Sequence, residues 1–502
     1  MKRFLTLCLL VAITAGAYAQ RAELSTDLCL RGTLNEAYES YPKGTPVALR
    51  KVIKLSKQNV ESLNGVVMAV EVEGVQRAIP VEALKQIDFA PASEQEFWQY
   101  IFLREGMYQH YESKGYRYDL RQDLAEESNK YLQDLAGLYY EDAYIEDYVQ
   151  AVFAQTTPPR IANKRPEVLS LRLLKSTAPD AYMLPNGTML ISTGLLSTLD
   201  SQDELMAIIA SEMAHYLLDH QVVNVGKAES RARRADFWGA VLSGVAEGVD
   251  QVLYDRCEYY VPGTSYVAAE LVAALINTGT TTRLGMTYTR KQEKEADQIA
   301  LDFLRFKHID PAALASALTK IKNYSIAEHD YYNLSRYGNY AELDERIAKL
   351  GEVKTLKSHP YLKAMSGVTT YNAILQQTSK RYESSARLAQ KNIDNKVYSD
   401  DDYIILAKAN MGLLNTPEAN EQSLQLLHQA MKMSTTPNLN AYKQEILLLL
   451  RMNKQAQASD ALKDYLDLIA KYQQQAGSGN EADWAAAEGS WAHKLLLRIS
   501  LF

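Results

Sequence analysis

The sequence has no apolar run long enough to span a bilayer, no excess of basic residues, and only three cysteines in 502 residues. Beyond the N-terminus the nearest approach to a membrane span is residues 237–254. Glu247 and Asp250 interrupt this stretch, so we expect an amphipathic helix there. The 54 basic residues are outnumbered by 61 acidic ones, which argues against nucleic acid as a partner. No transmembrane helix is expected, although association with a membrane surface stays open.

The first residues predict export. A basic start is followed by a short apolar run and by the small-x-small site Ala17-Tyr18-Ala19, which together are typical of a secretory signal. Residues 1–19 are therefore a predicted signal peptide, and the mature chain is expected to be secreted, periplasmic or in the cell envelope. Removing the signal leaves Cys29 and Cys257, which can form a disulfide or stay as two free thiols.

The rest of the chain has globular composition, with 47% hydrophobic and 23% charged residues, and its length predicts more than one domain. Residues 20–92 read as a small β-rich module. Within it, Val66–Val72 and Val75–Ile79 predict a hairpin that turns at Glu73-Gly74. Residues 93–365 mix helical and extended patterns. Residues 366–502 are helical, and their apolar spacing favours helical hairpins of a tetratricopeptide-like kind or a plain bundle.

One predicted helix in the 93–365 unit contains the sequence Ser211-Glu212-Met213-Ala214-His215. Zinc peptidases carry HExxH at such a place, because two histidines four residues apart lie on one helix face and can bind one ion. The glutamate beside the first histidine activates the metal-bound water. Here a serine replaces the first histidine, and an SExxH pentapeptide taken alone arises often by chance.

The surroundings make the pattern specific. Upstream lie Asp180-Ala181-Tyr182-Met183-Leu184-Pro185-Asn186-Gly187 and then Gly194-Leu195-Leu196, and downstream lies a helix that contains Glu293 and Asp297. Together with SExxH, these blocks resemble metallopeptidase family forty-eight, the zinc peptidases of the HtpX and CAAX prenyl protease type, over roughly residues 140–350. The resemblance implies an α+β, mainly helical fold. A zincin-like metallopeptidase domain would lie between the β module and the C-terminal helical hairpins.

The resemblance also assigns roles. Glu212 matches the catalytic base, His215 and Glu293 match two zinc ligands, and Asp297 matches a carboxylate that supports a ligand histidine. Ser211 stands at the position of the missing first ligand. The family's His-Pro pair ahead of Arg-Ile is lost as well, because Tyr340-Ala341 precedes Arg346-Ile347 and His359-Pro360 comes too late.

Neither of two other residues near His215 is expected to substitute as a ligand. Asp219 lies four residues after His215, but Tyr216 then stands where a base should be. His220 lies about 140° around a continuous helix from His215, so we expect it to pack elsewhere or to face solvent.

Two main functions follow from this reading. The chain is either an exported zinc endopeptidase with weak or lost activity, or a non-catalytic relative that binds client polypeptides as a scaffold of the cell envelope. An envelope scaffold that binds no peptide in the groove is a third possibility. Zinc is expected to be weakly bound or absent, since catalytic zinc sites use three protein ligands and two are retained here. The expected partner in either case is a polypeptide.

Overall fold

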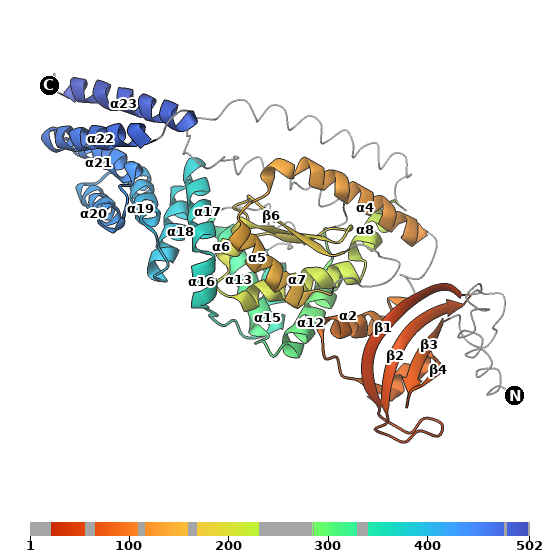
Figure 1. The fold of residues 1–502 in the computed structure, drawn as a ribbon. Helices are drawn as coiled ribbons and strands as arrows, with labels where there is room; N and C mark the ends of the chain where they lie inside the picture. Colours follow the sequence, from red (N-terminus) through yellow and green to blue (C-terminus); the bar gives the residue numbers. More distant parts are fainter. Residues whose placement is uncertain are drawn as a thin grey trace.

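The computed structural model describes residues 22–55, 66–108, 116–158, 168–229, 284, 286–328, 340–475 and 479–499. The predicted signal peptide, Cys257 and the predicted helix at 237–254 lie outside these residues. An N-terminal sheet, a central unit and C-terminal helices follow one another along the molecule (Figure 1). In the described part of the chain, no helix is long and apolar enough to cross a membrane.

The N-terminal module is an antiparallel sheet with strand order β4-β3-β2-β1-β5. Its elements are β1 (Ala22–Leu34), β2 (Pro46–Leu55), β3 (Val66–Val72), β4 (Val75–Pro80), the 3-10 helix η1 (Val81–Gln86) and β5 (Ile87–Phe89). The predicted β3–β4 hairpin is confirmed. Glu73 and Gly74 both adopt positive φ, 49° and 78°, as a tight two-residue hairpin turn requires. Cys29 lies in β1 and forms no disulfide with any residue that the structure describes.

Helix α2 (Glu94–Arg104) connects this sheet to the central unit. It begins after Ser93, whose side chain accepts a hydrogen bond from the backbone N–H of Glu96. Phe97 and Trp98 of α2 are buried, and their rings contact the ring of Phe303 at centroid distances of 5.3 and 5.8 Å. The module and the central unit therefore share one aromatic core.

The central unit is built on a sheet with strand order β6-β8-β7. β6 (Ser170–Leu174) runs parallel to β8 (Thr188–Ser192), and β7 (Ala181–Met183) runs antiparallel to β8. Helices surround the sheet (Figure 1). They are α4 (Tyr116–Asp134), the 3-10 helix η2 (Ala136–Leu138), α5 (Ala143–Thr156), α6 (Thr193–Thr198), α7 (Gln202–Leu217), α8 (His220–Glu229), α12 (Arg290–Phe306), α13 (Ala312–Ala327), α15 (Tyr340–Leu350) and α16 (His359–Ala364). The mainly helical α+β fold that the sequence predicted is therefore present.

The C-terminal helices pack mostly in sequential order (Figure 1). They are α17 (Ser366–Thr378), α18 (Tyr382–Asp394), α19 (Asp400–Leu413), α20 (Pro417–Met433), α21 (Leu439–Arg451), α22 (Gln455–Gln475) and α23 (Asn480–Ile499). Each is close in space to the next, which gives consecutive helical hairpins. Their classification as tetratricopeptide-like repeats stays a prediction.

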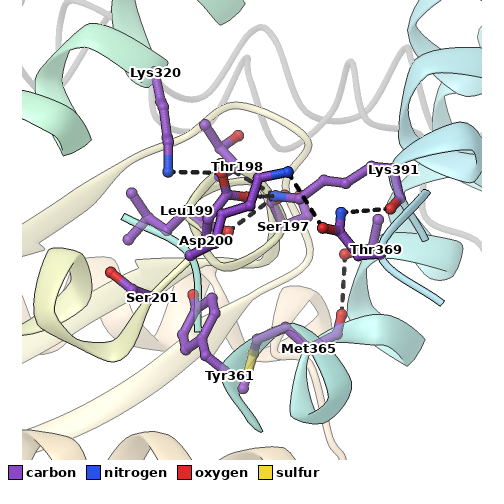
Figure 2. A network of polar contacts seen from close by, with 12 residues as sticks. Ser197, Thr198, Leu199, Asp200, Ser201, Lys320, Tyr361, Met365, Thr369 and Lys391 are labelled. Carbon is purple, nitrogen blue, oxygen red and sulfur yellow. Dashed lines mark hydrogen bonds and ion pairs between the residues drawn. The ribbon is translucent and has the colours of Figure 1, made fainter. Parts of the chain in front are cut away.

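A network of polar contacts attaches α18 to the central unit (Figure 2). Lys391 donates to the carbonyls of Ser197 and Leu199 at the end of α6, at 2.7 and 2.9 Å, and its ammonium lies 2.7 Å from the carboxylate of Asp200. Lys320 of α13 contacts the same carboxylate at 2.8 Å. The ammonium of Lys391 thus satisfies carbonyls that a helix end leaves without partners.

The two lysines also set the charge state of the carboxylate between them. Burial alone would raise the pKa of Asp200, but the ammonium groups of Lys391 and Lys320 outweigh burial and lower it. Burial lowers the pKa of Lys391. The predicted domain boundary near residue 365 is therefore crossed by buried, charged contacts.

Candidate active site

Helix α7 carries the first part of the site. It begins with a capping box, in which the side chains of Ser201 and Glu204 each accept from the backbone N–H of the other. Ser211, Glu212 and His215 are only 4%, 7% and 1% exposed. All three predicted positions therefore lie inside the central unit, on a helix whose start is firmly fixed.

Helix α12 carries the second part and packs against α7. It too begins with a capping box, formed by Thr289 and Gln292. Nε2 of His215 lies 3.4 Å from Oε2 of Glu293. The structure thus brings together the two residues predicted as retained zinc ligands, although they come from helices far apart in the sequence.

Helix α15 places Arg346 against Glu293 and Asp297 of α12. Its Nη1 atom lies 2.7 Å from Oε2 of Glu293, and its Nε and Nη2 atoms donate to Asp297 at 2.8 and 2.7 Å. Burial raises the pKa of Asp297, and the charge of Arg346 opposes that rise. The sequence predicted that Asp297 supports a histidine. In the described residues its hydrogen bonds go to Arg346 instead.

His220 belongs to the site, contrary to the expectation from a continuous helix. Helix α7 ends at Leu217, Asp219 adopts a left-handed φ of 57°, and α8 starts at His220. This break brings Nδ1 of His220 to 2.9 Å from Nδ1 of His215. His220 is 5% exposed, and burial, followed by the nearby charge of His215, lowers its pKa to about 3.

Asp219 is held by a different partner. Both of its carboxylate oxygens accept from Nε of Arg121 in α4, at 3.0 and 2.9 Å. The pair is fully buried, so the carboxylate is committed to an arginine. The structure therefore gives no support to a shifted site in which Asp219 serves as a metal ligand.

Comparison with known proteins identifies this unit. Residues 142–364 match the model of peptidase family M48. The chain is also 26% identical to the mitochondrial metalloendopeptidase OMA1 of Arabidopsis thaliana over 184 residues, which are 36% of this chain and 32% of that protein. Residues 142–364 thus resemble an M48 peptidase domain. The OMA1 protein of Schizosaccharomyces pombe is likewise 26% identical, over 144 residues that cover 28% of this chain and 34% of the relative. The chain thus spans about a third of the length of these curated relatives.

M48 peptidases are zinc-dependent, so the site can be tested against that ion. Two ligand atoms bound tetrahedrally at about 2.0–2.1 Å lie about 3.3–3.4 Å apart, and Nε2 of His215 and Oε2 of Glu293 are 3.4 Å apart. This edge fits zinc. The position of the third ligand does not fit zinc, because Ser211 offers only a neutral hydroxyl there. In addition, the guanidinium of Arg346 already contacts Glu293.

The rest of the chain offers no alternative ligand set within the ranges that the structure describes, where no group of three or more His, Cys, Asp or Glu residues is arranged to hold a metal. Among the described residues, His215 and Glu293 therefore supply two of the three protein ligands that a catalytic zinc site uses.

Proposed function

We propose that this chain is an exported protein that uses its M48 domain to bind polypeptides and hydrolyses them weakly or not at all. One observation carries the proposal: Ser211 replaces a zinc-binding histidine while Arg346 contacts Glu293 at 2.7 Å. Buried carboxylates require a compensating charge. A guanidinium provides that charge permanently and without a metal, since arginine stays protonated in proteins.

The edge of β7 is the proposed surface for an extended polypeptide. β7 ends the strand order β6-β8-β7, so one side of it pairs with no strand in the described sheet. Just beyond the two ends of β7, the backbone N–H of Leu184 donates to the carbonyl of Thr188, and the backbone N–H of Ser192 donates to the carbonyl of Asp180. Because paired and outward-facing residues alternate in an antiparallel ladder, Ala181 and Met183 direct their backbone groups outward. An added strand would bond to those groups.

A weakly active zinc endopeptidase is the second candidate. The 3.4 Å spacing of His215 and Glu293 favours it, as does Glu212 one position after Ser211, where the family's general base stands. An ion held by two protein ligands would bind far more weakly than one held by three, because even the loss of an outer supporting group costs about 10–100-fold in affinity.

Metal analysis, proteolysis and binding by the mature chain distinguish the two candidates. We expect less than stoichiometric zinc, no chelator-sensitive cleavage of casein, and binding of casein that a chelator leaves unchanged. Glu212→Gln is the matched variant, since it removes the base and keeps the size of the side chain. Stoichiometric zinc together with cleavage that Glu212→Gln abolishes would establish the endopeptidase and refute the binding-only proposal.

A further inference from the structure

The outward carbonyl of Met183 in β7 is already bonded within the chain. Nε2 of Gln221, in helix α8, donates to this carbonyl at 2.5 Å. Gln221 is 1% exposed, so this amide lies inside the protein. A carboxamide N–H is the same kind of donor as the backbone N–H of an added strand. Gln221 therefore occupies the bond that an incoming polypeptide would need at Met183.

Residues 286–289, which directly precede α12, also contact Gln221 and His215. The ring of Tyr288 stacks on the ring of His215, with centroids 3.6 Å apart and an interplanar angle of 17°. Nε2 of Gln221 reaches the hydroxyl of Tyr288 at 3.3 Å. Gln221 thus links the edge of β7 to the aromatic ring that covers His215.

Further contacts hold this segment in position. Asn224 of α8 donates to the carbonyl of Thr287 at 3.0 Å, and Gln292 of α12 donates to Asn224 at 2.8 Å. Leu284 and Met286 are buried in a cluster with residues of the β7–β8 hairpin and of α4. The segment is thus held by apolar packing at Leu284 and Met286 and by a hydrogen bond at Thr287.

We propose that Gln221 and Tyr288 form a self-blocking contact, which keeps the edge of β7 and His215 covered until a polypeptide displaces it. This regulation rests on the polypeptide binding proposed above. The displaced amide and ring can return to solvent, while the added strand takes over the Met183 carbonyl. Polypeptide affinity is thus lowered by the fraction of molecules in which the contact is closed.

The test uses the full mature chain and a labelled extended peptide of alternating valine and threonine. A matched peptide with every second amide N-methylated cannot donate to the strand edge. Gln221→Leu removes the donor at similar volume, and Tyr288→Leu removes the ring. Gln298→Leu is the control, since Gln298 lies on the exposed face of α12 and donates to Asp302 of the same helix at 3.3 Å.

Fluorescence anisotropy measures peptide binding, and the rate of carbethoxylation of His215, followed by mass spectrometry, measures its access independently. One net hydrogen bond changes an equilibrium by about three- to tenfold. We expect Gln221→Leu to raise both quantities by about that factor, Tyr288→Leu to do the same, and Gln298→Leu to match wild type. The N-methylated peptide should not bind.

The outcomes separate the two proposals. If both variants fold, as judged by circular dichroism, and neither peptide affinity nor His215 access rises, the self-blocking contact is refuted. If His215 access rises but no form binds the peptide, the contact covers the site as inferred and polypeptide binding at β7 is refuted.

Discussion

Ser211→His should restore zinc binding, and the structure shows why one substitution is enough. Ser211 lies one turn before His215 on the buried length of α7, so an imidazole there would project from nearly the same helix face. His215 and Glu293 already stand at the spacing of two tetrahedral ligands, 3.4 Å. The new side chain would complete three protein ligands and leave the fourth position to water.

The expected gain is at least about 100-fold in zinc affinity, since a direct ligand should exceed the roughly 10–100-fold effect of an outer supporting group. The guanidinium of Arg346 competes with the ion for Glu293. Once the ion displaces it from Glu293, its two hydrogen bonds to Asp297 can still hold it nearby. Ser211 is 4% exposed, so the larger ring must displace neighbours. That strain, about 1–3 kcal/mol, should appear as a lower melting temperature of the metal-free variant.

Competition with a chromophoric chelator measures the zinc dissociation constant of both forms. Ser211→Asn is the size control, because it adds bulk without an imidazole and should leave zinc affinity near that of wild type. Hydrolysis need not return, since Tyr340 stands where the resemblance expects a second histidine. If wild type already binds stoichiometric zinc tightly and Ser211→His adds nothing, the ligand assignment is wrong.

Three further outcomes are expected. Lys391→Met should lower the free energy of unfolding by about 3 kcal/mol, seen in urea titration, because Asp200 and the α6 carbonyls lose a partly buried ammonium. Stability should fall as pH decreases from about 6.5 to about 3, by up to about 4 kcal/mol, because unfolded His220 takes up a proton that the folded form excludes. His220→Gln should flatten that slope in the same titration. Mass spectrometry of the exported protein should give an N-terminus at or near Gln20, and an intact Met1 would contradict the predicted signal.

The sequence predicted those turns and helix starts that depend on neighbouring residues alone. The Glu73-Gly74 turn, with two positive φ angles, needs little from the rest of the chain. The start of α7 likewise follows from Ser201 and Glu204. Helical spacing then placed Glu212 and His215 on α7, and the motif order paired them with the distant Glu293.

His220 shows where this reasoning fails. A helical projection assumes that the helix continues, and Asp219 ends it with a left-handed φ. The carboxylate of Asp219 is anchored by Arg121, which comes 98 residues earlier in the sequence. No signal near His220 reveals that long-range pair. Arg346 was recognised in a motif, but its contact with Glu293 depends on how α15 packs, which the sequence does not encode locally.

Glu293, Asp297 and His215 are weak evidence for catalysis, because each of them also has a structural role. Glu293 and Asp297 share the guanidinium of Arg346, and His215 is bonded to His220 and stacked on Tyr288. Each has a structural partner besides any metal, so removing one would leave a buried charge or polar atom uncompensated at a cost of about 1–5 kcal/mol. Selection for stability alone would preserve them in a chain that, as proposed above, lacks the first zinc ligand. The presence of His215, Glu293 and Asp297 is thus a weak test of activity. Zinc binding by Ser211→His is a sharper test of whether the site descends from a zinc centre.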